Sequence, residues 1–481
     1  MSADKSSLYR LLKPDSIAVI GASNKGLYQA GILRNLLDGG FPGEIFPINP
    51  KYNNLFGLKC YSGVNQLPFA VALAIIVVNR QRVIEIVKQC AEFGVKSIVI
   101  ITAGFSESDE TGRELQHALS ELSCKYGLNI LGPNCAGFAN LPASVIATRL
   151  PCVSQPGTVS LVSQSGALMM ALYGLFIDNE IGVSKLISVG NQVDLTLSET
   201  LYYLSNDPQT DLISAFVEGL VDGKRFIQGA EQALVKGKPI VMVKSGRTQS
   251  GIKIAETHTA AVAGSDKAFE AVCEQFGIIL VDDVHQMMDV LKLHNTYKER
   301  LPKSTRFLVV TQSGGLGTLT ADFFEKEGLK LTPLHKALLS EIKQDPNLTH
   351  INNQNNPVDV RGASLRDSAT ERTLTHFLQD PNFNLVMLLL ARTSYQAEDI
   401  ETAQAIVKVQ KETGKPLVVV WVGQQLPIDQ SSSDLTALRI LRQANIPTFR
   451  QPSDAVKALA GIYHYWRYQE EYLRHVWVEE S

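Results

Sequence analysis

The sequence lacks several patterns that would identify common enzyme and binding classes. It has no G-x-x-x-x-G-K-[ST] motif and no G-x-S-x-G elbow, which argues against a P-loop nucleotide site and an α/β-hydrolase. Its six cysteines form no C-x-x-C pair, which argues against a structural zinc site or a disulfide framework and suits a reducing cytosol. With 45 Lys and Arg against 48 Asp and Glu, the chain also lacks the basic excess of a generic nucleic-acid binder.

Long hydrophobic segments are missing as well. No run approaches the ~18 apolar residues of a transmembrane helix, and the first 16 residues lack the apolar core of a signal peptide. Hydrophobic residues make up 45% of the chain and charged residues 19%, which is enough for an ordinary packed core. We therefore expect a cytoplasmic protein whose 481 residues form two to four domains, at ~100–200 residues each.

Short apolar runs rich in β-branched residues alternate with helix-length amphipathic segments. Such continuous runs are typical of parallel strands that are buried on both faces, and the alternation predicts a doubly wound α/β architecture. The predicted strands comprise residues 16–21, 44–49, 71–78, 95–101, 129–134, 158–163, 185–190, 212–219, 239–246, 306–314, 385–391, 416–423 and 446–450.

Two breaks in this alternation, near 150–157 and 296–305, predict three domains, which are residues 1–150, 151–300 and 301–481. The second and third series resemble each other. SLVSQSGAL (160–168) aligns with LVVTQSGGL (308–316), and a GKP-containing strand follows in both series. Two matches in the same order favour a duplicated domain; the alternative is that both are common strand-loop-helix sequences.

The first strand, SIAVIG, leads into a glycine-containing turn and then a helix. Backbone N–H groups at such a turn, together with the helix dipole, favour a phosphate group. The glycines do not follow G-x-G-x-x-G and no acidic ribose partner follows about twenty residues later, which disfavours an NAD(P)-dependent dehydrogenase. Lys51, just beyond the second strand, is placed to reach a phosphate, or it is a solvated surface lysine.

The two Q-S-G turns are the sharpest local signals. Each follows a strand and begins a helix, so it presents free N–H groups and a serine hydroxyl at a helix N-terminus. One such turn is explained by N-capping alone. Two copies in a duplicated pair suggest that both face one anion.

His258 and Glu218 are the candidates for proton and phosphoryl chemistry. His258 lies in THTAAVAGSD, a segment of small residues that suits an exposed loop and a nucleophilic imidazole, although a surface histidine is the simpler interpretation. Glu218 ends an apolar strand at the edge where α/β sheets bind ligands. A carboxylate there can accept a hydrogen bond from an imidazole, or it pairs with a surface lysine.

Taken together, these motifs resemble the α subunit of NDP-forming acyl-CoA synthetases of the ADP-forming acetate–CoA ligase type, which are relatives of succinyl-CoA synthetase. The resemblance extends over essentially the whole chain. It rests on VIGAS (19–23), NPKY (49–52), ITAGFSE (101–107), GPNCAG (132–137), SQSGAL (163–168), VEG (217–219), KSGRT (244–248), THTAAVAGSD (257–266), TQSGGLG (311–317) and NPVDV (356–360).

The resemblance implies an α/β fold in which an N-terminal Rossmann-like CoA-binding domain is followed by two flavodoxin-like CoA-ligase domains. It implies that His258 is phosphorylated in the catalytic cycle and that Glu218 orients it. It further implies two groups of ligand-binding residues and no bound metal in this chain. The phosphate-binding residues are Gln164, Ser165, Gly166, Ser313, Gly314 and Gly315. The CoA-binding residues are Gly21, Ala22, Ser23, Lys25, Asn49, Lys51 and Asn134.

The implied substrates are a small carboxylic acid, CoA and the corresponding acyl-CoA. ADP or ATP and Mg²⁺ are expected on a separate β subunit with an ATP-grasp domain, in an α2β2 heterotetramer, because no segment of this chain resembles that domain. At the loop of His258, Ala260 replaces the glycine that is common in the family, which should stiffen the backbone modestly. The alternative function is a CoA-sensing or acyl-CoA-sensing regulatory module that has lost catalysis.

Overall fold

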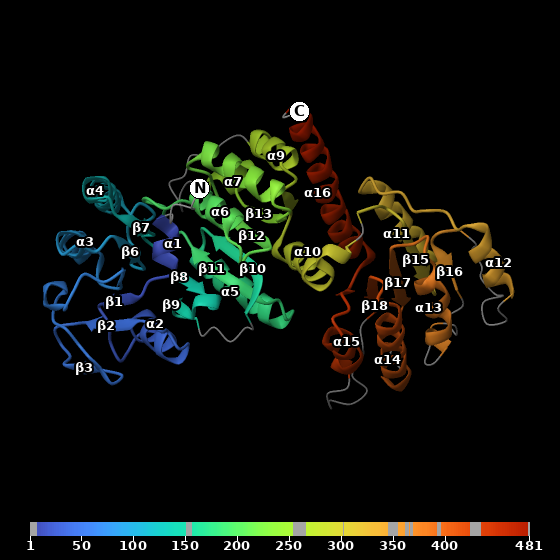
Figure 1. The fold of residues 1–481 in the computed structure, drawn as a ribbon, viewed down its shortest axis with the longest axis horizontal. Coiled ribbons are helices and arrows are strands. Elements are labelled where there is room, and N and C mark those ends of the chain that lie inside the picture. The colour runs from blue at the N-terminus through green and yellow to red at the C-terminus, as the bar shows by residue number, and fades with distance from the viewer. Residues whose placement is uncertain are drawn as a thin grey trace. The chain divides into compact units, whose positions relative to one another are not determined.

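The computed structural model describes residues 7–150, 156–253, 266–301, 303–344, 355–360, 365, 369–391, 396–423 and 434–479. The chain divides into two compact units. The first comprises residues 1–287 and 471–481, and the second comprises residues 288–470. Helices flank the strands of the main sheets (Figure 1), which confirms the predicted α/β class.

The first sheet contains five parallel strands in the order β2-β1-β5-β6-β7. Its strands are β1 (Ser16–Ile20), β2 (Glu44–Ile48), β5 (Leu73–Ile76), β6 (Ser97–Ile100) and β7 (Asn129–Leu131). Its helices are α1 (Ser7–Leu12), α2 (Leu27–Asp38), α3 (Val83–Glu92) and α4 (Glu110–Tyr126), with short 3-10 turns at Val64–Gln66 and Arg80–Arg82. A small hairpin of β3 (Asn54–Leu55) and β4 (Leu58–Lys59) follows β2.

The second sheet has seven strands in the order β14-β13-β12-β10-β11-β8-β9. Its parallel strands are β10 (Pro156–Ser163), β11 (Val183–Ser188), β12 (Leu212–Val217), β13 (Ile240–Lys244) and β14 (Ile279–Val281). The antiparallel strands β8 (Gly137–Asn140) and β9 (Val145–Thr148), linked by a 3-10 turn at Leu141–Ala143, extend it at the β11 edge. Its helices are α5 (Gly166–Asp178), α6 (Leu197–Asn206), α7 (Gly223–Val235) and α9 (Asp266–Gln275), and α10 (Val284–Tyr297) begins in the first unit and continues into the second.

The third sheet has five parallel strands in the order β16-β15-β17-β18-β19. They are β15 (Phe307–Thr311), β16 (Val358–Asp359), β17 (Leu385–Ala391), β18 (Leu417–Val422) and β19 (Thr448–Phe449). A 3-10 turn at Lys298–Arg300 precedes them. The accompanying helices are α11 (Gly314–Lys326), α12 (Lys336–Gln344), α13 (Ala369–Gln379), α14 (Gln396–Thr413), α15 (Asp434–Gln443) and α16 (Pro452–Glu479).

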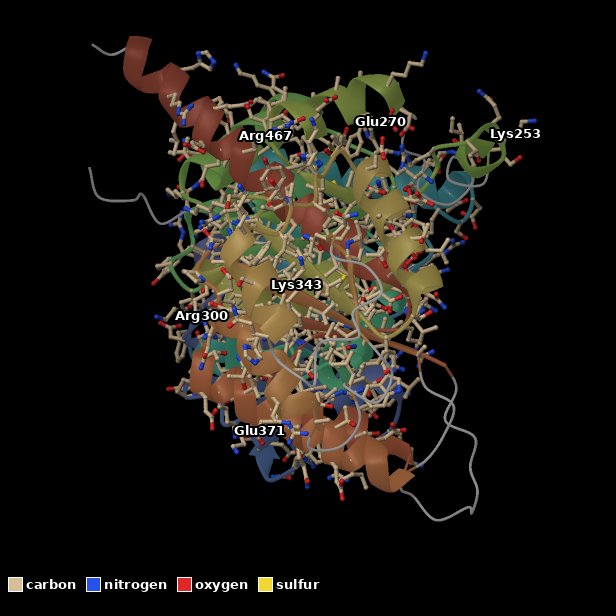
Figure 2. The ribbon with its side chains drawn as sticks, turned by 90° about the vertical axis from the view of Figure 1, so that its right-hand side faces the viewer. Lys253, Glu270, Arg300, Lys343, Glu371 and Arg467 are labelled. Atoms are coloured by element: carbon tan, nitrogen blue, oxygen red, sulfur yellow. The ribbon has the colours of Figure 1, made fainter. Side chains whose placement is uncertain are left out.

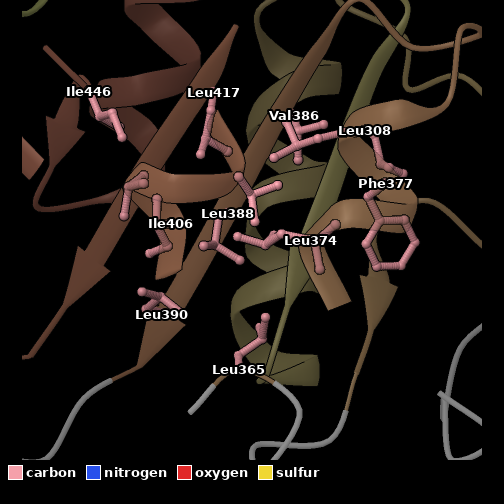
Figure 3. Close-up of a cluster of buried hydrophobic side chains, with 14 of the residues drawn as sticks. Leu308, Leu365, Leu374, Phe377, Val386, Leu388, Leu390, Ile406, Leu417 and Ile446 are labelled. Carbon is pink, nitrogen blue, oxygen red and sulfur yellow. The ribbon is translucent and has the colours of Figure 1, made fainter. Parts of the chain in front are cut away.

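The core of the second unit shows why these apolar runs form strands. Figure 3 shows Leu308, Val386, Leu388 and Leu417 from adjacent strands beside Leu374 of α13. All of them are fully buried. Because helices cover both faces of a parallel sheet, each central strand must be apolar on both sides, and the sequence shows this as a continuous hydrophobic run.

In chain order, the parallel strands of all three sheets are arranged 2-1-3-4-5, which is the flavodoxin-like order. Every strand predicted from the sequence is present. Short strands were not predicted, namely β3, β4, β8, β9, β14 and β16. Two of them, β8 and β9, precede the expected boundary at residue 150 but pair with the second sheet, because Ile187 of β11 lies opposite Phe138 of β8.

Hydrogen bonds connect the first two sheets, in addition to the chain that runs from one to the other. The segment after β11 runs beside the end of β7, where Leu195 N donates to Ile130 O at 3.1 Å and Val193 N donates to Gly132 O at 3.0 Å. The carboxylate of Asp194 accepts the N–H of Ile130 at 2.8 Å, and burial raises the pKa of Asp194. Residues 190–195 thereby satisfy backbone groups that an edge strand would otherwise leave open.

A buried ion pair lies within the second sheet's domain. Lys185 of β11 is 1% exposed, and its Nζ donates to the carboxylate of Asp207 at 2.5 Å. The hydroxyl of Thr210 donates to the same carboxylate oxygen at 2.6 Å. Burial lowers the pKa of Lys185, and the hydrogen bond that Lys185 donates to Asp207 opposes that shift.

We predict that Lys185→Met lowers the free energy of unfolding by about 3–5 kcal/mol, because it leaves the carboxylate of Asp207 buried without its cation. The double variant Lys185→Met/Asp207→Leu should lose much less, because no charge then remains uncompensated. Urea unfolding of both variants measures this difference. Equal losses in the single and double variants would contradict the role assigned to the ion pair.

Candidate functional site

The candidate residues within the described ranges lie in loops or at helix starts near the carboxyl ends of the strands. In a 2-1-3-4-5 sheet the chain reverses direction of winding between the first and third strands, and ligands bind in the crevice at that switch point. The switch points here lie between β1 and β5, between β10 and β12, and between β15 and β17. The turns that follow β1, β10 and β15 are the three that the sequence singled out.

The turn after β1 requires glycine at its first position. Gly21 has φ +89°, and a Cβ built on it would lie 2.2 Å from the carbonyl oxygen of Val77. Ser23 Oγ accepts the N–H of Lys25 at 3.1 Å and lies 3.3 Å from the hydroxyl of Tyr52. The turn is therefore held in a defined conformation by its own side chains and by the loop after β2.

Asn49 joins the turn after β1 to the loop after β2. Its Nδ2 donates to Ala22 O at 2.8 Å, and its Oδ1 accepts the N–H of Lys51 at 3.0 Å. Lys25 and Lys51 are both exposed on these two loops. A tight turn at a helix N-terminus with two accessible lysines fits phosphate groups, so the residues present match the chemistry of a phosphorylated ligand.

Asn134 lies among different neighbours. It has φ +56°, and its backbone N–H donates to Thr102 O at 3.0 Å. Its side chain donates to Asn191 Oδ1 at 3.2 Å, in the loop after β11. The described contacts therefore join Asn134 to the loops after β6 and β11.

Asn191 and Glu107 form a polar network that the sequence reasoning missed. Asn191 Nδ2 lies 2.5 Å from Glu107 Oε2 and 2.9 Å from Gln116 Oε1. Glu107 also accepts the N–H of Gly104 at 2.6 Å. Asn191 and Glu107 both lie shortly after predicted strands. This position near a strand end is the sequence signal that could have identified them.

The turn after β10 places a serine at the N-cap of α5. Ser165 Oγ accepts the N–H of Leu168 at 3.3 Å, and Ser163 Oγ donates to Ser165 O at 2.8 Å. The first helical residue, Gly166, packs closely, since a Cβ built on it would lie 3.0 Å from the Cβ of Ala136. The first position of α5 therefore has little room for any side chain larger than glycine.

Gln164 connects this turn to the loop of Glu218. Its Nε2 donates to Gly219 O at 2.6 Å, and its Oε1 accepts the N–H of Gly219 at 3.1 Å as well as that of Glu218. Lys244 Nζ, at the end of β13, donates to Glu218 O at 3.4 Å and to Ser245 O at 2.9 Å. Burial lowers the pKa of Lys244. The structure thus brings Ser165, Gly166 and Glu218 to one switch point.

His258 lies outside the described residues, so its prediction is untested by the structure. The segments on either side of it are joined by an ion-pair cluster. Arg247 binds the carboxylate of Asp266 at 3.2 Å and that of Glu270, which is labelled on α9 in Figure 2. These pairs link the loop after β13 to α9.

The turn after β15 repeats the capping hydrogen bonds of the turn after β10. Ser313 Oγ accepts the N–H of Leu316 at 3.5 Å, and Thr311 Oγ1 donates to Ser313 O at 3.1 Å. Gln312 Nε2 donates to Ala391 O at the end of β17. Gly314 begins α11, and a Cβ built on it would lie 3.1 Å from Asp359 Oδ2. The matching hydrogen bonds support a duplicated domain.

Among the residues that the structure describes, no three His, Cys, Asp or Glu side chains gather in a way that could hold a metal ion. Within the same ranges, none of the helices combines the length and the apolar character needed to cross a membrane.

Comparisons with known proteins agree on one family. A family model for a CoA binding domain matches residues 15–140, and a model for a succinyl-CoA ligase like flavodoxin domain matches residues 156–294. The α subunit of acetate–CoA ligase (ADP-forming) II of Pyrococcus furiosus is 36% identical, over 93% of this chain and 96% of that protein. Acetate–CoA ligase (ADP-forming) I of Archaeoglobus fulgidus is 34% identical, over 95% of this chain but only 63% of that protein.

A solved structure also matches almost the whole chain. It is the dinucleotide forming acetyl-coenzyme A synthetase 1 of Ca. Korarchaeum cryptofilum, in complex with phosphate and ADP. The TM-score is 0.86 at 33% sequence identity, with 97% of this chain and 98% of that chain covered.

We predict that Gly21→Ala destabilises the first sheet's domain by more than about 2 kcal/mol, because the added Cβ overlaps the carbonyl of Val77 in addition to the unfavourable φ. Gly40→Ala is the matched control. Gly40 has φ +67° but nothing within 4 Å of a built Cβ, so only the ~1–2 kcal/mol of the left-handed conformation should be lost. Thermal and urea unfolding compare them, and similar losses in both variants would show that the close approach at Gly21 is unimportant.

Proposed function

The chain belongs to the α subunits of ADP-forming acyl-CoA synthetases in the succinyl-CoA synthetase superfamily, and we propose that it interconverts acyl-CoA and carboxylic acid through a phosphorylated His258. The complete reaction converts acyl-CoA, ADP and phosphate into a carboxylic acid, CoA and ATP. The observation that carries the proposal is the switch point of the second sheet, where the N-terminus of α5 and the loop of Glu218 are hydrogen-bonded together through Gln164.

The first steps take place at this switch point. A phosphate oxygen attacks the thioester carbon, the C–S bond breaks, and the thiolate leaves as CoA, which gives an acyl phosphate. An imidazole nitrogen of His258 then attacks phosphorus, and the carboxylate leaves. The N–H groups at the start of α5, around Ser165 and Gly166, face the developing negative charge and stabilise it without a fixed cation. Glu218 accepts a hydrogen bond from the imidazole and fixes its orientation.

CoA fits the first sheet's domain. Its phosphate groups are placed at the turn after β1, with Gly21, Ala22 and Ser23 supplying backbone approach and Lys25 and Lys51 supplying positive charge. Asn49 holds the two loops together. We assign Asn134, whose side chain contacts the loop after β11, to the thioester end of CoA. When bound, CoA supplies the thiol that forms the thioester.

A partner subunit supplies the rest of the reaction. This chain spans under two thirds of the Archaeoglobus fulgidus protein, whereas it spans nearly all of the Pyrococcus furiosus α subunit. We assign ADP and Mg²⁺ to an ATP-grasp domain on a separate β subunit, in an α2β2 heterotetramer. We propose that Ser313, Gly314 and Gly315 at the start of α11 also bind a phosphoryl group.

The cytoplasm is the compartment we propose. Five cysteines lie within the described residues, and all five are free thiols. Burial raises the pKa of Cys90 and Cys135 to about 12, so both remain protonated and unreactive at neutral pH. Unpaired cysteines in the core suit a reducing environment.

We predict that wild-type protein incubated with acetyl-CoA and inorganic phosphate gains one phosphoryl group and that His258→Ala gains none. Intact-protein mass spectrometry at neutral or alkaline pH, where phosphohistidine survives, measures this. Circular dichroism confirms that the variant is folded. Phosphorylation of the variant to the wild-type level would refute the mechanism. CoA binding without phosphorylation, even with a β subunit and a range of acyl-CoA substrates, would support a regulatory module instead.

We predict that Lys51→Ala weakens CoA binding by roughly 2–5-fold at low salt, because one exposed charge pair contributes about 0.5–1 kcal/mol. Its effect should shrink at high ionic strength, where the pair is screened. Isothermal calorimetry at two salt concentrations measures both. Lys88→Ala on α3 removes the same charge from an exposed position on a helix; if it weakens binding equally, the placement of phosphate at the loop edge is wrong.

A further inference from the structure

We infer that Gln164 is a positioning residue, which holds the backbone of Glu218 across the switch point of the second sheet instead of binding the phosphoryl group. This inference deepens the proposed function and rests on it, since Glu218 matters here as the residue that orients the phosphorylated histidine. It assigns the phosphate contacts of the Q-S-G turn to Ser165 and Gly166.

The hydrogen bonds of Gln164 leave little of its carboxamide for a ligand. A carboxamide has two acceptor positions and two donor positions. The N–H groups of Glu218 and Gly219 occupy the two acceptor positions, and Gly219 O occupies one donor position. The backbone N–H of Gln164 is also engaged, since it donates to Phe216 O at 3.3 Å.

Burial makes this arrangement specific. Gln164 is 7% exposed, and a buried carboxamide that loses its partners pays the full cost of desolvation. The loop at 218–219 is therefore held in one conformation. Lys244 adds a contact from the next strand, because its Nζ donates to Glu218 O at 3.4 Å. With its N–H and its C=O both fixed, Glu218 projects its side chain from a defined backbone position.

The third sheet has a glutamine at the equivalent position, and of the carboxamide contacts of Gln164 it repeats only the hydrogen bond donated to backbone. Gln312 follows β15 as Gln164 follows β10, and it donates to Ala391 O at the end of β17. There the strand ends in alanine, where the second sheet has Glu218. In both sheets the glutamine donates to backbone across the switch point, although only the second sheet has a glutamate there. The role of the glutamine is therefore independent of the glutamate side chain. Gln312 therefore provides a matched control.

The test uses Gln164→Met, which keeps the length of the side chain and removes its hydrogen bonds. We expect the rate of acyl-CoA-dependent phosphorylation to fall by about 10–100-fold with an unchanged KM for phosphate. In the double variant with Glu218→Gln, we expect no further loss beyond that of Glu218→Gln alone, because both changes act through one group. A raised KM for phosphate, or losses that add in the double variant, would overturn the inference.

Gln164→Glu gives a pH-dependent test. The neutral carboxyl group can accept from the loop and donate to Gly219 O, as the carboxamide does, whereas the carboxylate repels that carbonyl. Burial should raise the pKa of the introduced group, so its neutral form becomes populated as pH falls. The activity of Gln164→Glu relative to wild type should rise toward low pH, and that of Gln164→Met should stay flat. A flat ratio for both variants would contradict the positioning role.

Hydrogen exchange tests the hydrogen bonds between Gln164 and the loop at 218–219 without reference to activity. The amides of Glu218 and Gly219 should exchange faster in Gln164→Met, whereas Gln312→Met should leave them unchanged. Unchanged exchange in a folded Gln164→Met protein would overturn the inference even if its activity fell. Absence of phosphorylation in the wild type itself, with a β subunit present, would instead contradict the proposed function and, with it, this inference.

Discussion

The strand order of the three sheets is the constraint on which the rest of the structure depends. In each sheet the chain winds one way from the first strand to the second and the other way from the first to the third, which leaves a crevice at the carboxyl edge. Helices that start beside that crevice direct their N–H groups into it. Every candidate residue within the described ranges, from Gly21 to Gly315, is in a loop or at a helix start that this winding brings to the edge.

Such a crevice must be kept open and also kept in shape. Side chains that bind backbone across it do both, because they fill space without placing a competing charge at the helix terminus. Gln164 does this between the loops after β10 and β12, and Gln312 does it between those after β15 and β17, whereas Asn49 joins the loops after β1 and β2 beside the first crevice. All three are neutral amides, which is the chemistry that leaves the positive helix terminus available to an anion.

The sequence predicted the main strands well because buried parallel strands must be apolar on both faces, so runs such as 71–78 and 385–391 are unambiguous. It also placed Glu218 and the Q-S-G turns correctly at the carboxyl edge. It could not predict β8 and β9, because four-residue antiparallel strands have no distinctive period, and β11, with which β8 pairs, lies more than forty residues away. The hydrogen bonds of Gln164 and Asn191 were equally inaccessible, because a glutamine or asparagine side chain suits many partners and only the fold selects one.

The attachment of β8 and β9 to the second sheet, together with residues 190–195 beside β7, has a consequence for how this family can be rearranged. If the chain were cut at residue 150, β8 and β9 would remain with the CoA-binding piece, where they have no sheet to pair with. The other piece would lose the two strands that cover β11. The boundary of the expected CoA-binding domain therefore differs from the boundary of the segment that can fold by itself. Gene fusions that move its domains between subunits should therefore keep the first two sheets together.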